Sequence, residues 1–164
     1  MMKKLHLIRH AKSGWPSSNM ADIERPLNQR GVEACAVMAE QIVKAGCSFE
    51  HVFCSAAVRT QATLENISQH LEQPILWKVD QALYTFESSD LWTWCRALDE
   101  QMAEVVIVGH NNALTDFVNE IGDQSIDNVP TCGYVQIVLP GVPWQAITQH
   151  SGTVASFLRP KMFS

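Results

Sequence analysis

Residues 104–112 read EVVIVGHNN, an apolar run that ends in a polar cluster. Four consecutive aliphatic residues, Val105 to Val108, are typical of a strand that is buried on both faces of a sheet. A helical pattern begins soon afterwards, at about Ala113, and continues to Ile121. This succession predicts an α/β fold with a largely parallel sheet.

Strand-length apolar runs alternate with helical stretches on both sides of this segment. Strands are expected at residues 3–9, 51–55, 75–79 and 134–139, and a last strand at 144–149 is expected to pair with its predecessor. Helices are expected at residues 29–45, 56–71 and 88–99, the last of them capped by Ser88 or Ser89. The sequence shows no internal repeat and no linker, so residues 1–164 are expected to form one domain.

The composition restricts the kinds of partner. The chain has 164 residues, of which 46% are hydrophobic and 18% charged, and this excludes a disordered protein. Its net charge of −5 argues against a surface that binds nucleic acid or anionic membrane as a whole, so any anion site has to be local.

The sequence also bears on location. Residues 1–10 lack the apolar region of a signal peptide, and no run approaches the roughly 20 apolar residues of a membrane span. A cytoplasmic protein is therefore expected. Its five scattered cysteines are expected to be buried and unpaired.

Three of the predicted strands end in polar clusters, at residues 9–13, 55–59 and 109–112. In a parallel α/β sheet the carboxyl ends of the strands form the ligand-binding edge. The clusters bring five cationic or titratable side chains to that edge: Arg9, His10, Lys12, Arg59 and His110. Guanidinium groups at such a position need an anion, and their geometry matches phosphate oxygens. The residues alone therefore predict a phosphate pocket with two imidazoles, one of which can act as a nucleophile.

These motifs resemble the histidine phosphatase superfamily, and in particular its SixA-type phosphohistidine phosphatase branch. The resemblance begins with LIRHAKSGW at residues 7–15 and continues with RPLN at 25–28 and Gly31. It extends through Ser55 with Arg59 and Thr60, LY at 83–84 and VGHN at 108–111, and so covers about residues 3–139 in order. The fold that it implies is a three-layer α/β/α sandwich with a mostly parallel central sheet, phosphoglycerate mutase-like.

The resemblance also implies roles for individual residues. His10 matches the histidine that is phosphorylated, Arg9 the arginine beside it, Arg59 the second phosphate-binding arginine and His110 the second histidine. The implied mechanism transfers the phosphoryl group to His10 and then to water, with no metal or organic cofactor. Further candidates for phosphate contact are Lys12, Ser13 and Asn111, although Lys12 could equally be an ordinary exposed lysine.

Three departures from the mutase-type pattern point to the smaller phosphatases. Ala11 replaces the glycine that usually follows the nucleophile, Lys12 replaces a glutamate and Pro16 an asparagine. Asp22 and Glu24 are candidates to pair with Arg25 and order the long loop that contains them.

The general acid is the least defined element. Larger relatives use a carboxylate after the third strand, where this chain offers Glu87 and Asp90, and both also suit the first turn of an exposed helix. Phosphohistidine needs such an acid less than an alkyl phosphate does, because its leaving imidazole has a pKa of about 6.5.

The expected partner is a protein that bears phosphohistidine or a small phosphate ester, with phosphate or sulfate in the pocket and neither nucleic acid nor membrane. The alternatives are a small-molecule phosphomonoesterase and a catalytically idle phosphate- or phosphopeptide-binding module. A cysteine phosphatase built on Cys54 and Arg59 would need five intervening residues and has four. A metal hydrolase built on His10 and His110 is disfavoured by the adjacent arginines.

Overall fold

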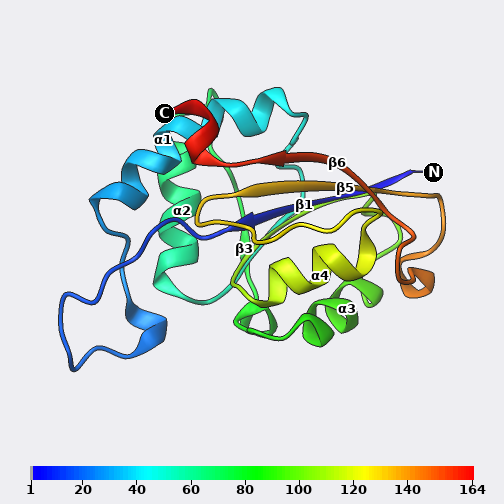
Figure 1. Ribbon diagram of the computed structural model, residues 1–164, viewed down its shortest axis with the longest axis horizontal. Helices are drawn as coiled ribbons and strands as arrows, with labels where there is room; N and C mark the ends of the chain where they lie inside the picture. Colours follow the sequence, from blue (N-terminus) through cyan, green and yellow to red (C-terminus); the bar gives the residue numbers. More distant parts are fainter. Residues whose placement is uncertain (1) are drawn as a thin grey trace.

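The computed structural model describes residues 2–164 and contains a six-stranded central sheet with the strand order β3-β2-β4-β1-β5-β6 (Figure 1). The strands are β1 (Lys3–Arg9), β2 (Val52–Cys54), β3 (Lys78–Val79), β4 (Glu104–Gly109), β5 (Tyr134–Leu139) and β6 (Thr153–Leu158). β1, β2, β3 and β4 are mutually parallel, whereas β5 is antiparallel to β1 and to β6. The mostly parallel sheet expected from the sequence is confirmed.

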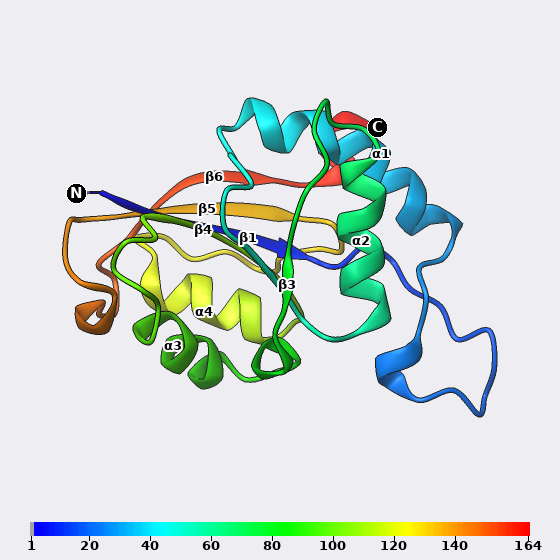
Figure 2. The ribbon, with the colours of Figure 1, turned by 180° about the vertical axis from the view of Figure 1, so that it is seen from behind.

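Four helices cover the two faces of the sheet: α1 (Gln29–Lys44), α2 (Val58–Ser68), α3 (Ser88–Arg96) and α4 (Ala113–Ile121). α1 and α2 pack together on one face and α3 and α4 on the other, as the two opposite views show (Figure 1, Figure 2). Alternate residues of β4 enter the two cores: Val105 and Ile107 pack toward α3 and α4, and Val106 and Val108 toward α1 and α2. The three-layer sandwich is therefore confirmed, together with the doubly buried strand that was expected at its centre.

Several boundaries differ from those expected. β1, β4, β5 and α4 have the expected bounds, whereas β3 is only two residues long. Ser88 and Ser89 lie within α3, whose N-cap is Glu87 and has no side-chain capping bond. All five cysteines are buried and free.

The last strand was predicted in the wrong place. Residues 144–149 do not form a strand; they begin with a 3-10 helix, η3 (Trp144–Ala146), and the strand that pairs with β5 is β6. Trp144 and Ile147 are both buried while the two residues between them are exposed, which is the spacing of a helical turn. β6 is only partly buried along its length, so it lacks the apolar alternation that would identify it.

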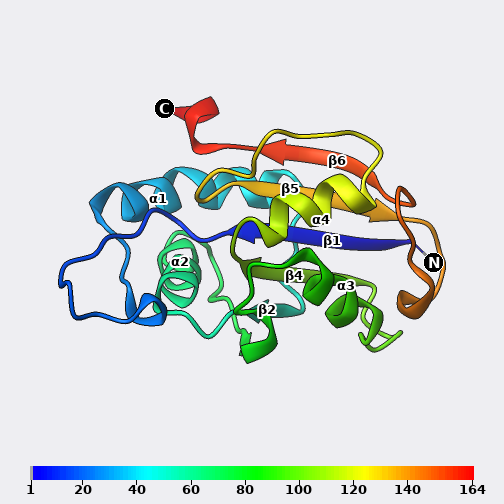
Figure 3. The same cartoon turned by 60° about the horizontal axis from the view of Figure 1, so that its bottom comes forward.

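The loop between β1 and α1 extends beyond the carboxyl edge of the sheet and carries a short 3-10 helix, η1 (Asp22–Glu24), which packs against α2 (Figure 3). Gly31 in the first turn of α1 lies directly against this loop, since a Cβ there would be 2.2 Å from the Lys12 carbonyl oxygen. Asn28 caps the same helix by accepting a hydrogen bond from the Gly31 amide at 2.9 Å. The start of the loop is thereby fixed against α1. Among residues 2–164, every helix falls short of the length and apolar character that crossing a membrane requires.

Candidate active site

Arg9 and His10 lie where β1 ends, and main-chain bonds fix them there. The His10 amide donates to the Gly109 carbonyl of β4 at 3.2 Å. From the other side, the Cys132 amide lies 3.0 Å from the carbonyl oxygens of both Arg9 and His10. The two side chains therefore leave the sheet from a rigid position.

The His10 ring is oriented by one hydrogen bond. Its Nδ1 lies 2.7 Å from the Ala11 carbonyl oxygen, which can only accept, so the proton is on Nδ1 and Nε2 has a free lone pair. Burial and, to a lesser extent, the charges of Arg59, Arg9 and Arg25 together lower the pKa of His10 to about 4, against the opposing effect of the Ala11 bond. His10 is therefore neutral at pH 7 and has an unprotonated nitrogen available.

His110, at the end of β4, faces His10 with their ring centroids 5.4 Å apart. Its Nε2 lies 2.7 Å from Ser55 Oγ, and Arg59 donates to its Nδ1 at 3.4 Å. Burial, and then the charge of Arg59, lower the pKa of His110 to about 3. The substrate-free site thus holds two neutral imidazoles between cationic groups.

Aromatic side chains close the far side of His110. The rings of Tyr84 and Phe86 meet it edge-on, with centroid distances of 5.4 Å and 5.5 Å. Both come from the segment after β3, which also carries the candidate acid Glu87.

Each of the two arginines has an unused donor. Arg59 is only 2% exposed. Among residues 2–164, its Nε and the Nε of Arg9 are the only buried side-chain nitrogen or oxygen atoms without a hydrogen-bond partner. Arg9 donates from Nη1 to the Val129 carbonyl at 3.0 Å. Buried donors are normally satisfied, so each of these two Nε–H groups is available to an acceptor such as an anion.

The Asp22 carboxylate places one negative charge beside Arg59. Its carboxylate accepts hydrogen bonds from Arg59 at 3.0 Å, from Arg25 at 3.2 Å and from the Tyr84 hydroxyl at 2.5 Å. Burial alone would raise the pKa of Asp22, but the bonds from Tyr84 and Arg59 and the charge of Arg59 lower it to about 2. Asp22 is therefore ionised at pH 7 and in contact with Arg59.

The sequence predicts only part of this arrangement. The expected pairing of Asp22 with Arg25 is present, whereas Glu24 accepts from the Ala21 amide instead. The contact between Asp22 and Arg59 joins residues that are far apart in the chain, so no local sequence pattern predicts it.

Residues 5–84 match the family model described as histidine phosphatase superfamily (branch 1). This segment, just under half of the chain, is similar to the histidine phosphatase superfamily. Arg9, His10 and Arg59 lie within the matched segment, and His110 lies beyond it. The family resemblance noted from the sequence is thereby confirmed.

Curated relatives of this chain differ in how much they share with it. A 2,3-bisphosphoglycerate-dependent phosphoglycerate mutase of Lactiplantibacillus plantarum is 33% identical over 78 residues, which cover 46% of this chain and 33% of the mutase. An uncharacterised chloroplastic protein of Arabidopsis thaliana is 23% identical over 92% of this chain and 72% of its own length. The chain spans only a third to about half of the curated mutases that it matches.

Solved structures share the fold over nearly the whole chain. A protein histidine phosphatase SixA complexed with tungstate has a TM-score of 0.81 at 20% identity and covers 98% of this chain and 99% of its own. A candidate phosphohistidine phosphatase SixA from Nakamurella multipartitia has a TM-score of 0.78 at 20% identity, with coverage of 98% and 97%. A phosphoglycerate mutase from Bacillus anthracis is less similar, with a TM-score of 0.63 at 14% identity and 92% coverage of both chains.

The other candidate residues lie around this centre in different roles. Ser13 Oγ accepts from Arg25 at 2.8 Å and so holds the loop. Asn111 uses its whole amide group: Oδ1 accepts from the Thr115 amide and hydroxyl, and Nδ2 donates to Asn128 and to the Val129 carbonyl. Lys12 is exposed.

The two acid candidates point elsewhere. Glu87 is exposed, and its carboxylate takes part in no hydrogen bond or ion pair within the part of the chain that the structure describes. Asp90, in the first turn of α3, accepts from the Thr85 hydroxyl at 2.6 Å, which ties it to the segment just before the helix. Neither is joined to the histidines by any of these bonds.

Cys54 does not have the properties of a nucleophile. It is fully buried at the end of β2, and burial raises the pKa of its thiol to about 12. The cysteine phosphatase alternative therefore lacks its thiolate.

Proposed function

We propose that this protein is a phosphohistidine phosphatase, which hydrolyses protein-borne phosphohistidine through a covalent intermediate on His10. The observation that carries the proposal is the free Nε2 of a neutral His10, held by the Ala11 carbonyl beside two arginines with unused donors. A nucleophile of this kind needs no activating base, because its lone pair is already available at pH 7.

In the first step, the Nε2 lone pair of His10 attacks phosphorus and forms a new N–P bond. The substrate P–N bond breaks with its electron pair on the substrate nitrogen, and a proton on the other nitrogen of that ring makes the leaving group neutral imidazole. Arg9 and Arg59 stabilise the phosphoryl oxygens during transfer, as preorganised cations in a dry site do effectively.

His110 changes its protonation state when the anion arrives. An adjacent phosphoryl dianion favours the charged imidazole, so the pKa of His110, about 3 beside the arginines alone, rises on binding. Once Nδ1 takes a proton from solvent, it no longer accepts from Arg59 and donates to a phosphoryl oxygen instead, while Nε2 stays bonded to Ser55. This adds one hydrogen bond that forms only with the phosphoryl group present.

In the second step, water attacks the phosphorus of phospho-His10. The new O–P bond replaces the Nε2–P bond, both water protons remain on the dihydrogen phosphate that is released, and His10 returns to its neutral state. No group outside the chain and the water is required.

Phosphohistidine is the favoured substrate because none of the candidate carboxyl groups within residues 2–164 is bonded to the histidines as a proton donor for an alkoxide would be. Asp22 is ionised, with a pKa of about 2, and Glu87 and Asp90 are engaged elsewhere or exposed. An imidazole leaving group departs without an acid more readily than an alkoxide does. The fold shared with a structure named protein histidine phosphatase SixA, which holds the phosphate-like tungstate, supports this choice.

The test is phosphate release from a phosphohistidine-bearing protein and from a panel of phosphate esters, combined with mass spectrometry of the intact enzyme at alkaline pH. Wild type is expected to release phosphate from phosphohistidine and to gain the mass of one phosphoryl group. His10→Ala is expected to do neither, and His70→Ala, which changes an exposed histidine on the surface, to behave as wild type.

Other outcomes favour the alternatives. Faster hydrolysis of an ester than of phosphohistidine would indicate a small-molecule phosphomonoesterase. Binding of phosphate without turnover of any substrate would indicate an idle phosphate-binding module.

A further inference from the structure

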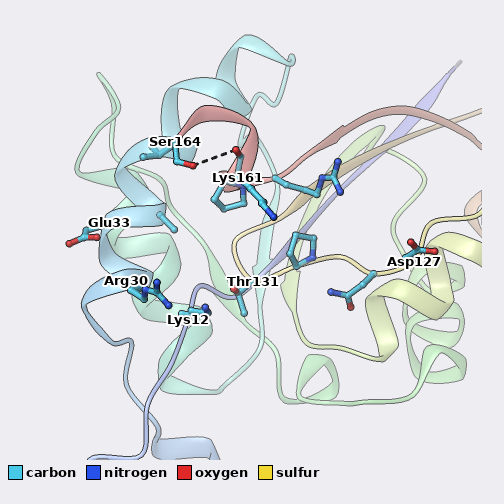
Figure 4. A pocket seen from close by; sticks show the side chains of 13 residues that line it. Lys12, Arg30, Glu33, Asp127, Thr131, Lys161 and Ser164 are labelled. Carbon is cyan, nitrogen blue, oxygen red and sulfur yellow. Dashed lines mark hydrogen bonds between the residues drawn. The ribbon is translucent and has the colours of Figure 1, made fainter.

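A cavity of about 810 Å³ lies beside the site but does not include His10 (Figure 4). Its wall carries four cationic side chains from three parts of the chain: Lys12 after β1, Arg30 in α1, and Arg159 and Lys161 after β6. Within residues 2–164, none of the four forms an ion pair. In a protein whose net charge is −5, this is a concentration of unpaired positive charge.

The cavity and the site share a wall. Pro130 and Thr131 line the cavity, and the adjoining Val129 and Cys132 bond to Arg9 and His10 through their main chains. Lys12 follows His10 by two residues and faces the cavity. A chain that presents a side chain to His10 can therefore continue into this space.

Carboxylates do not cancel the positive charge. Two acidic residues, Glu33 and Asp127, also line the cavity. Figure 4 shows Glu33 turned away from Lys12 and Arg30, and Asp127 at the opposite end. The end of the cavity that Lys12 and Arg30 line is thus more positive than the end near Asp127.

The cations are spread out rather than converging on one point. Figure 4 shows Lys161 on a different side of the cavity from Lys12 and Arg30, and small or apolar side chains such as Ala34 and Pro130 also line the cavity. A single phosphate needs donors that converge, whereas a chain with several carboxylates matches separated cations.

We propose that this cavity binds an acidic peptide segment of the phosphorylated protein next to its phosphohistidine. This inference rests on the proposed function for the identity of the protein that carries the segment. The cations would then supply affinity and orientation for a protein substrate without taking part in the chemistry.

The test uses two synthetic peptides with the same phosphohistidine, one flanked by glutamates and the other by glutamines, and phosphoramidate as a small substrate. Wild type is expected to show a lower KM for the acidic peptide, and this KM should rise with sodium chloride. The double variant Arg30→Glu/Lys161→Glu is expected to raise the KM of the acidic peptide by roughly fivefold to tenfold. Its KM for the neutral peptide and for phosphoramidate should not change.

The matched control is Lys78→Glu, which reverses an exposed charge at the opposite edge of the sheet, in β3. Arg30 and Lys161 are also exposed, and thermal unfolding of each variant verifies that it folds. Equal KM values for the two peptides on wild type, or an equal effect of Lys78→Glu, would overturn the inference. Displacement of the acidic peptide by a short RNA at lower concentration would also overturn it, because the cavity would then be a nucleic-acid site.

A binding experiment separates this inference from the proposed function. If wild type fails to release phosphate from phosphoramidate or peptide, the proposed function fails. Retention of the glutamate peptide by His10→Ala protein, measured by fluorescence anisotropy and reduced by Arg30→Glu/Lys161→Glu, would still support the cavity as an acidic-peptide site.

Discussion

At the scale of single residues, the most informative feature is the neutral state of the His10 ring, which has a proton on Nδ1 and none on Nε2. Burial and three arginines lower its pKa to about 4, so nitrogen NMR should show the Nδ1–H tautomer unchanged between about pH 7 and pH 5, where a free imidazole would protonate. Because the pKa is about 6.5 in the unfolded chain, stability falls as pH drops through that value and stops falling below the folded pKa. Protonation of the His10 ring near its ordinary pKa would contradict the assignment of a free nucleophile.

Asp22 gives a second prediction at this scale, because its carboxylate competes with the substrate for Arg59. Asp22→Asn removes that competitor and should lower the Kd for inorganic phosphate by about fivefold to tenfold, as measured by calorimetry. The same change leaves the nearly buried Arg59 without its counter-charge. It should reduce the free energy of unfolding without phosphate by about 1–2 kcal/mol, a modest loss because Asp22 is partly exposed to solvent.

Glu24→Gln is the control for Asp22→Asn, because Glu24 lies in the same 3-10 helix and its side chain bonds only to the Ala21 amide. Weaker phosphate binding by Asp22→Asn would instead make Asp22 a residue that positions Arg59 for its anion.

At the scale of elements, the site depends on how closely α1 approaches the loop after His10. Gly31→Ala places a Cβ 2.2 Å from the Lys12 carbonyl oxygen, which is main chain and cannot rotate away. We expect a loss of about 1–3 kcal/mol of unfolding free energy by urea titration, together with lower kcat as the loop shifts. Glu33→Ala, an exposed change two residues further along the same helix, should leave both quantities close to wild type.

The elements also show how far the sequence leads. Strands with a two-sided apolar run, such as β4, were predicted with their bounds, because the pattern depends only on burial. The two-residue β3 and the half-exposed β6 were not, since their backbone pairing leaves little trace in side-chain hydrophobicity. Likewise, the residues at strand ends, Arg9, His10 and His110, could be identified locally, whereas the contact of Asp22 with Arg59 depends on the path of a long loop.

At the scale of the whole molecule, charge is unevenly distributed. The chain has a net charge of −5, yet Arg9, Arg25, Arg59 and Lys12 gather where the parallel strands end, and the cationic cavity adjoins them. The molecule as a whole repels anions weakly, while this edge attracts them. Association with an anionic substrate should therefore depend on ionic strength more than the net charge would suggest.

A last prediction follows from the unused donors of Arg9 and Arg59. An anion that binds only the folded protein stabilises it by about 2.7 kcal/mol at a hundred times its Kd, so phosphate should raise the Tm by several degrees. Sodium chloride at equal ionic strength should not, because chloride cannot bridge two guanidinium groups as a phosphate does. His10→Ala should keep most of the effect, since the arginines hold the anion, whereas Arg59→Lys should lose most of it. An equal rise in Tm for wild type and Arg59→Lys in scanning calorimetry would mean that phosphate binds elsewhere, with the cationic cavity as the nearest candidate.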